Sequence, residues 1–252
     1  MTKEIIFSIR GLRKKFSNNI EALAGIDLDI IAGECLLIAG ANGSGKTLLM
    51  KILVGLAAPT EGEILFWEKP VAQCKDAIRR SVGLVYQDPD AQILGETVEE
   101  DIRFGPENLK LPEEEIKSRL EKTLASLDLA EKRDFSTRHL SGGEKRRLAA
   151  AGVLAMGCET IIMDEPFANL DWPGVVQVLT IISFLKKSGR TIIILTHELE
   201  KVLAFADRLV ILADGKIKDS GVPEAVLDRL DPAWGVRDPR KSYRNVGDCT
   251  WL

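Results

Sequence analysis

A glycine-rich stretch early in the chain has the residue types and spacing to bind phosphate. It reads Gly40-Ala41-Asn42-Gly43-Ser44-Gly45-Lys46-Thr47 and fits the pattern G-x-x-x-x-G-K-[ST]. Glycine permits backbone conformations closed to other residues, so successive N–H groups can point at phosphate oxygens. Lys46 would supply a positive charge for the outer phosphates, and the Thr47 hydroxyl would bind Mg²⁺. A chance glycine-rich turn is the alternative, but the apolar segment before the motif and the helical segment after it favour a phosphate site.

Two adjacent carboxylates form a second candidate site. Asp164 and Glu165 follow the apolar run Ile161-Ile162-Met163 and precede Pro166. A strand that ends in Asp164 would place its carboxylate at the carboxyl edge of a parallel sheet, beside the phosphate loop. Asp164 would hold Mg²⁺ there, directly or through water, and Glu165 would polarise an attacking water. An isolated Asp-Glu pair is more often a helix start or a surface turn, but the preceding strand and Pro166 favour the functional interpretation.

The elements that would position these residues indicate an α/β protein. Apolar runs of strand length alternate with helical stretches, which is typical of a largely parallel sheet. Residues 4–10 and 26–31 instead alternate apolar and polar side chains, as half-buried strands do. Asp214-Gly215 predicts a type I′ hairpin turn. The predicted buried strands are Cys35–Ala39, Val82–Tyr86, Thr160–Met163, Thr191–Leu195 and Leu209–Leu212, and Thr47–Val54 is expected to be helical.

The middle and the end of the chain differ from this core. Pro112-Glu113-Glu114-Glu115 predicts a helix start, because proline and acidic residues are favoured in a first turn. We expect a helical lobe over about residues 88–157, inserted in a domain that covers residues 1–231. Residues 232–252 lack periodicity but contain Trp234, Tyr243 and Trp251. They are interpreted as a partly ordered tail; an aromatic contact with a partner subunit is the alternative.

Composition limits the classes of function. The net charge of −4 over 252 residues predicts no strong attraction to nucleic acid or to anionic membranes. The basic runs, such as Lys145-Arg146-Arg147, are interpreted as solvated faces. No apolar run approaches the roughly 20 residues that span a bilayer, and no secretory leader is recognisable, so any membrane link is expected to come through a partner. The four cysteines have no C-x-x-C spacing and are interpreted as reduced cytosolic residues.

A third motif changes the interpretation of the first two. Leu140-Ser141-Gly142-Gly143-Glu144 lies between them and precedes a helical run that begins near Lys145. Two glycines at a helix start would form a second anion site. The three motifs in this order resemble those of ATP-binding cassette (ABC) ATPases, and the resemblance extends to about residue 230. It implies an α/β fold with a P-loop NTPase core, a mainly parallel sheet, an antiparallel β lobe and an inserted helical lobe.

The resemblance also implies a set of site residues. Residues 141–143 would cap the γ-phosphate of ATP bound to the opposite subunit, so two ATP molecules would lie at the interface of a head-to-tail dimer. His197 would contact the γ-phosphate, Gln87 would meet Mg²⁺ and the membrane partner, and Asp171 would lie on the loop that crosses the dimer interface. Phe16 would stack on adenine, with a core aromatic as its alternative. The implied ATP ligands are Phe16, Gly40, Ala41, Asn42, Gly43, Ser44, Gly45, Lys46, Thr47, Leu48, Ser141, Gly142, Gly143 and Asp171; the implied Mg²⁺ ligands are Thr47, Gln87 and Asp164; the implied catalytic residues are Glu165, His197, Lys46 and Gln87.

The segment from Gln87 to Leu111 is similar to that of a narrower group, the ATPases of energy-coupling factor (ECF) importers of cobalt, nickel or vitamins. It follows their pattern with Asp88, Arg103 and Lys110 in place of the usual Asn, Ala and Gly. The similarity implies three partners: a second ATPase subunit, identical or related, a transmembrane coupling subunit and a membrane subunit that binds the solute. The chain would lie peripherally on the cytoplasmic face of the cell membrane.

Two other functions are open. A soluble ABC ATPase of translation or DNA repair would keep the chemistry without a membrane partner, but such proteins resemble double cassettes or carry long coiled-coil insertions, and neither is present in this sequence. A non-catalytic nucleotide sensor is the other alternative. It is disfavoured because Lys46, Glu165 and His197 are all present.

Overall fold

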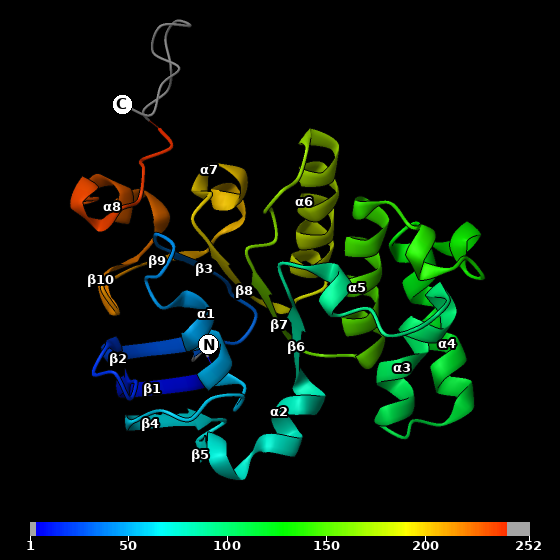
Figure 1. Cartoon of the computed structure of the whole chain (residues 1–252), viewed down its shortest axis with the longest axis horizontal. Helices are drawn as coiled ribbons and strands as arrows, with labels where there is room; N and C mark the ends of the chain where they lie inside the picture. Colours follow the sequence, from blue (N-terminus) through cyan, green and yellow to red (C-terminus); the bar gives the residue numbers. More distant parts are fainter. Residues whose placement is uncertain (1–3, 241–252) are drawn as a thin grey trace, which may run out of the picture.

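The computed structural model describes residues 4–240, which contain two β-sheets and a group of helices (Figure 1). The larger sheet has the strand order β10-β9-β3-β8-β7-β6. Its strands β9, β3, β8, β7 and β6 run parallel, and β10 pairs antiparallel with β9. The predicted mainly parallel sheet is therefore confirmed. The bounds are β3 Cys35–Ala39, β6 Val82–Val85, β7 Thr160–Asp164, β8 Thr191–Thr196, β9 Arg208–Ala213 and β10 Lys216–Gly221.

The smaller sheet is entirely antiparallel, with the order β2-β1-β4-β5. Its first two strands are longer than their alternation predicts. The strands β4 and β5 had no sequence signal, because Trp67 and Glu68, which join them, adopt positive φ values of 46° and 63° without a glycine. The bounds are β1 Ile5–Lys15, β2 Glu21–Ile31, β4 Glu61–Phe66 and β5 Lys69–Pro70.

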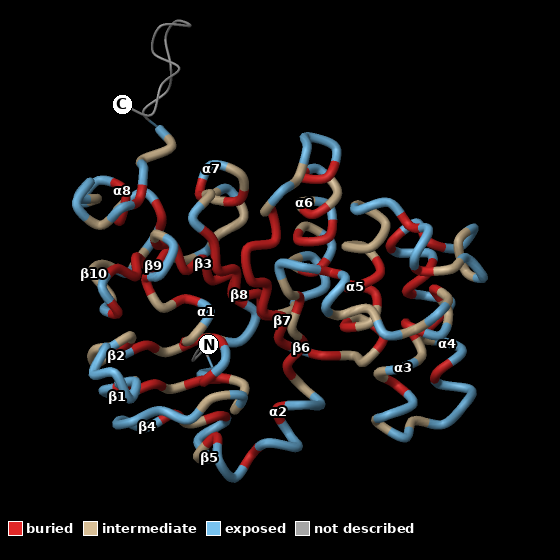
Figure 2. The backbone as a smooth tube through the Cα atoms, viewed as in Figure 1, coloured by how far each residue is buried: buried red, intermediate tan, exposed pale blue. Residues whose placement is uncertain are grey.

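Both faces of the five parallel strands are largely buried, which explains their continuous apolar sequences (Figure 2). Alternate residues of a strand point to opposite faces. Leu36 and Ile38 of β3 join a core shared with the smaller sheet and the first helix. Cys35 and Leu37 join a second core, which contains most of the buried apolar residues of the helices that follow residue 97. The strands that end at the candidate site are thus fixed from both sides.

One helix lies between the two sheets, and three others form a separate group. Helix α1 packs between the two sheets, and α3, α4 and α5 form a group between β6 and β7 in the chain, where a helical lobe was predicted (Figure 1). The helix bounds are α1 Lys46–Leu53, α2 Lys75–Ser81, α3 Val98–Asn108, α4 Glu113–Ser126, α5 Gly142–Met156, α6 Trp172–Lys187, α7 Leu199–Val202 and α8 Pro223–Asp228.

Capping explains where α5 begins. The Ser141 hydroxyl accepts the N–H of Glu144 at 3.3 Å, and the Glu144 carboxylate accepts the N–H of Ser141 at 2.8 Å. This capping box satisfies two N–H groups that have no partner inside the helix. The helix therefore starts at Gly142, three residues before the predicted start near Lys145.

The end of the described chain contacts the domain. Val236 is buried, and Trp234 packs against the core that contains β9. Tyr243 and Trp251 lie outside the described residues. The predicted type I′ turn is confirmed, since Asp214 and Gly215 have φ values of 51° and 67°. Within residues 4–240, no helix is both long and apolar enough to span a bilayer.

Candidate functional site

The glycine-rich loop joins β3 to α1 and depends on glycine at specific places. Gly43 and Gly45 have φ values of 83° and 106°, which favour glycine. A side chain at Gly40 would place its Cβ 2.2 Å from the carbonyl oxygen of Leu212. The Ser44 hydroxyl is buried in the loop with no hydrogen-bond partner among the described residues. A phosphate group fits this loop, because it would accept from such an unpaired donor and from the backbone N–H groups.

Lys46 is held inside the loop. Its side chain is only 5% exposed, and its Nζ donates to the carbonyl oxygens of Gly40 at 2.7 Å and Ala41 at 3.2 Å. The same nitrogen lies 3.3 Å from Oε1 of Glu165, an oxygen that makes no hydrogen bond. The ammonium group therefore connects the loop to the acidic pair at the end of β7.

Thr47 and Asp164 meet as the sequence predicted. The Thr47 hydroxyl donates to the Asp164 carboxylate, at 2.8 Å from Oδ2 and 3.1 Å from Oδ1. Burial raises the pKa of Asp164 from its ordinary value, and the Thr47 hydrogen bond partly opposes this shift. A hydroxyl and a carboxylate are the hard oxygen donors that Mg²⁺ prefers. Within residues 4–240, no group of three or more His, Cys, Asp or Glu side chains is placed to hold a metal ion.

Glu165 has a constrained backbone and a well-held side chain. Its φ of 46° is unusual for a non-glycine residue, and its N–H donates to the carbonyl oxygen of Leu195 on β8 at 2.8 Å. The carboxylate oxygen Oε2 lies 3.0 Å from the Thr196 hydroxyl and 3.0 Å from Nδ1 of His197. Backbone strain at a residue whose side chain is held in this way is typical of functional sites.

Thr196 is the residue that the sequence reasoning missed. It is fully buried, donates to Oε2 of Glu165 and accepts the N–H of Glu198 at 3.0 Å. A hydroxyl at the end of an apolar strand, next to His197, was the available signal. The role given to His197 is compatible with its position, because its side chain is 45% exposed while one ring nitrogen faces Glu165.

Three predicted site residues make no hydrogen bond or ion pair with this cluster among the described residues. Phe16 is 46% exposed, so the core-aromatic alternative is wrong; Nζ of Lys14 lies 5.9 Å from its ring centroid. Gln87 is exposed just after β6. Asp171 is the N-cap of α6, and its carboxylate accepts the N–H of Gly174 at 3.0 Å. The roles of Phe16, Gln87 and Asp171 stay predictions.

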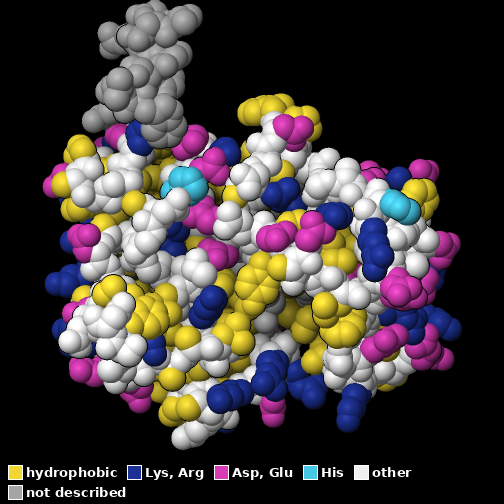
Figure 3. Space-filling model, in the orientation of Figure 1, with side chains coloured by type: hydrophobic (Ala, Val, Ile, Leu, Met, Phe, Trp, Pro, Cys, Tyr) yellow, Lys and Arg dark blue, Asp and Glu magenta, His cyan; other side chains and the backbone are white. Residues whose placement is uncertain are grey.

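The serine–glycine loop, residues 141–143, does not meet the phosphate loop of its own chain. Figure 1 shows α1 and α5 on opposite sides of β7 and β8. Ser141 and Gly142 are exposed at the start of α5. Figure 3 shows the two histidines of the chain, in cyan, well separated on one face of the molecule. His197 belongs to the Glu165 cluster, and His139 lies two residues before Ser141.

The run Lys145-Arg146-Arg147 is not the solvated face that the sequence suggested. Arg146 donates to the carbonyl oxygen of Ala168 at 2.6 Å, and burial lowers its pKa. Lys145 forms a 2.6 Å ion pair with Asp90. These two contacts connect the start of α5 to the loop before Asp171 and to the segment after Gln87.

Comparisons with known proteins agree with this geometry. The family model described as ABC transporter matches residues 23–168. The cobalt import ATP-binding protein CbiO of Rhodobacter capsulatus is 40% identical over 238 residues, which cover 93% of this chain and 85% of the relative. The energy-coupling factor transporter ATP-binding protein EcfA of Methanocaldococcus jannaschii is 38% identical over 229 residues, which cover 90% and 82%.

A solved structure gives the same result. The structure of cbiO1 from Clostridium perfringens, described as part of the ABC transporter complex cbiONQ, matches with a TM-score of 0.83 and 36% identity. The match covers 90% of this chain and 92% of that one. Because the family model spans more than half of the sequence and the relatives span most of it, the chain belongs to the ABC transporter family of ATP-binding proteins.

Proposed function

We propose that this chain is the ATP-hydrolysing subunit of an ECF-type importer and lies on the cytoplasmic face of the membrane. The main support for the proposal is a cluster of four side chains at the carboxyl edge of the larger sheet: Lys46, Thr47, Asp164 and Glu165. The importer part of the proposal rests on relatives named for cobalt import and for energy-coupling factor transport, each covered over more than four-fifths of its length.

The cluster supplies what phosphoryl transfer to water needs. Lys46 would neutralise phosphate charge, and Thr47 with Asp164 would hold Mg²⁺. When bound, that ion would offset the negative charge of the phosphate oxygens. Glu165 would orient the attacking water and accept its proton, with its carboxylate aimed by Thr196. His197, whose Nδ1 lies 3.0 Å from Oε2 of the same carboxylate, would contact the γ-phosphate.

The serine–glycine loop supports a composite site. It is an exposed helix start on α5, and Figure 1 shows α5 and α1, which follows the phosphate loop, on opposite sides of β7 and β8. A second ATPase subunit, identical or related, would place its own loop on the γ-phosphate. Because that contact requires the γ-phosphate, ATP would favour the closed dimer and ADP would not. Membrane contact would then come through a coupling subunit and a solute-binding subunit, near Gln87 and the helical lobe.

The test is to solubilise native membranes mildly, isolate the tagged chain, identify the proteins that accompany it and measure ATP hydrolysis of the isolated complex. We expect a transmembrane coupling subunit, a small membrane-embedded subunit, and hydrolysis that falls at least about a hundredfold in Glu165→Gln. Glu159→Gln is the matched control, because Glu159 is exposed just before the opposite end of the same strand.

Two results would contradict the proposal. Undiminished hydrolysis by Glu165→Gln would remove Glu165 from the chemistry. Recovery of an active ATPase only from the soluble fraction, without membrane subunits, would favour a soluble ABC ATPase instead.

A further inference from the structure

The segment Arg133–Thr137, four residues before Ser141, runs alongside the start of α3. The first N–H groups of a helix have no partner within it. Here the neighbouring segment supplies carbonyl oxygens for them, and Thr97 forms an antiparallel bridge with Ser136. The backbone hydrogen bonds that join the two segments are Val98 N to Phe135 O (3.1 Å), Glu99 N to Arg133 O (3.0 Å) and Thr137 N to Glu96 O (3.0 Å).

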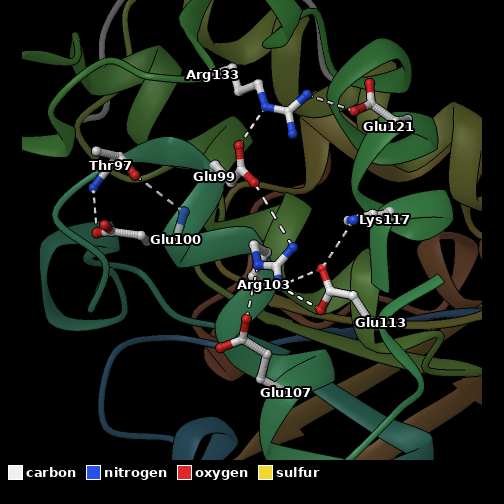
Figure 4. Close-up of polar contacts among 9 residues, drawn as sticks. All are labelled: Thr97, Glu99, Glu100, Arg103, Glu107, Glu113, Lys117, Glu121 and Arg133. Atoms are coloured by element: carbon white, nitrogen blue, oxygen red, sulfur yellow. Dashed lines mark hydrogen bonds and ion pairs between the residues drawn. The ribbon is translucent and has the colours of Figure 1, made fainter. Parts of the chain in front are cut away.

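Two arginines reinforce this junction with side-chain contacts (Figure 4). The Arg133 guanidinium donates to Glu99 on α3 and, at 2.7 Å, to Glu121 on α4. Arg103 lies 3.9 Å from the other oxygen of Glu99 and 2.9 Å from Glu113 at the start of α4. The Arg133 hydrogen bond lowers the pKa of Glu99, so this carboxylate is charged at neutral pH. Glu99 is thus shared by two cations from different segments.

The junction is continuous with the serine–glycine loop. Nζ of Lys132 lies 3.6 Å from Oε1 of Glu144, the glutamate that completes the capping box with Ser141. Leu140 is buried, so the short connection from Thr137 to Ser141 is held at both ends. A displacement of residues 133–137 would therefore move the serine–glycine loop.

The junction is also connected to the segment that follows Gln87. The Asp101 carboxylate of α3 accepts the N–H groups of Leu94 at 2.7 Å and Gly95 at 3.0 Å. The Thr137 hydroxyl donates to the Gly95 carbonyl oxygen at 2.8 Å. The turn at residues 94–95 thus contacts both α3 and the segment that leads to Ser141 through short, partly buried hydrogen bonds. A displacement of either one would therefore displace the other.

We propose that Glu99 and Arg133 are positioning residues that fix the serine–glycine loop relative to α3, so that a movement of α3 moves the loop. The inference rests on the proposed function, because the loop acts on nucleotide bound to a second subunit. Neither residue touches the nucleotide. Their effect is on the closed dimer, and the phosphate loop is left unchanged.

The experiment compares full-length Glu99→Gln, Arg133→Gln and the double variant with Glu107→Gln. Glu107 is the matched control, because it pairs only within α3, with Arg103 at 2.9 Å. We expect kcat for ATP to fall roughly three- to tenfold in both single variants, a size typical of residues that carry coupling between sites. We expect the loss in the double variant to be smaller than the product of the two single losses, because both changes remove the same Arg133–Glu99 pair.

Two further readouts separate positioning from general loss of structure. ADP affinity, measured by calorimetry, should be unchanged, because ADP reports on the phosphate loop without the γ-phosphate. Amide hydrogen exchange at Val98, Glu99 and Thr137 should accelerate in the single variants and not in Glu107→Gln, since these N–H groups make the bonds between the segments.

The results distinguish a failure of the positioning role from a failure of the proposed ATPase function. If the wild type hydrolyses ATP and Glu99→Gln matches Glu107→Gln in kcat and in amide exchange, the positioning role is wrong and the proposed function stands. Additive losses in the double variant would also overturn it, because the two residues would then act separately. A wild-type chain without ATP hydrolysis would overturn both.

Discussion

The carboxylate of Glu165 depends on its neighbours for orientation. One oxygen faces Lys46 and the other receives the Thr196 hydroxyl, while the backbone holds an unfavourable positive φ. A local motif predicts that an Asp-Glu pair ends a strand. The motif does not predict which residue of β8 orients the Glu165 carboxylate, because that depends on how β7 pairs with β8.

At the residue scale, Thr196→Val should impair catalysis without preventing nucleotide binding. Valine keeps the shape of threonine but cannot hold Oε2 of Glu165, so we expect kcat to fall roughly tenfold with little change in KM. The partly buried N–H of Glu198 would also lose its acceptor, which should lower the free energy of unfolding by about 1 kcal/mol. Steady-state kinetics and urea unfolding measure the two effects.

The control for this variant lies at the other end of the same strand. Thr191 is equally buried, and its hydroxyl accepts the N–H of Gly33 at 2.8 Å, far from the acidic pair. Thr191→Val should show a comparable loss of stability with unchanged kcat. Equal kcat losses in both variants would mean that Thr196 acts only through stability.

At the element scale, the sequence predicted best what depends on local pattern. The strand β3 was predicted with its observed bounds, and the predicted strands at β7 and β8 each ended one residue early, because apolar runs between turn signals are a local feature. The strand pattern also predicted that Asp164 lies beside the phosphate loop that contains Thr47, because parallel strands of one sheet end at the same edge. The junction of Arg133 with Glu99 had no such signal, because 34 residues separate its members in the chain.

The start of α3 should show a pH dependence of stability. Asp101 is buried, and this burial raises its pKa above the ordinary value of about 3.9, against the opposing N–H groups of Gly95 and Leu94. The folded state therefore binds this proton more tightly than the unfolded state. Its contribution to the free energy of unfolding is most favourable at low pH and decreases as pH rises from about 3.9 through the raised pKa.

Asp101→Asn tests this sign, because asparagine accepts the same N–H bonds without a titrating proton. The free energy of unfolding of the wild type, minus that of the variant, should decrease as pH rises through the window. Urea unfolding between about pH 3.5 and 6.5 measures it, with the exposed Asp134→Asn as control. A difference that grows with pH would contradict the assignment.

At the scale of the whole molecule, the separation of the two nucleotide-contacting loops predicts complementation between chains. Where the second subunit is another copy of this chain, Lys46→Ala and Ser141→Arg should each be inactive as homodimers. In a mixed dimer the intact phosphate loop of one chain meets the intact serine–glycine loop of the other. The mixed dimer should then regain about half of wild-type hydrolysis, because it carries one sound site of two.

Co-expression of the two variants with different tags and ATPase assay of the doubly purified species measure this. Recovery would show that the site is built from two chains. An inactive mixed dimer would contradict the head-to-tail arrangement for identical subunits.

The last described residues show that the packed domain extends beyond the last nucleotide-binding motif. Val236 lies in the core that also contains β9, and a Cβ on Gly235 would lie 3.2 Å from the side chain of Ala41 in the phosphate loop. Burial of a valine side chain contributes about 1.5–3 kcal/mol. A fragment that stops at residue 231 would retain each motif of nucleotide chemistry and yet expose apolar surface beside it. Fusion partners and affinity tags should therefore be joined after Val236, so that this side chain stays packed in the core.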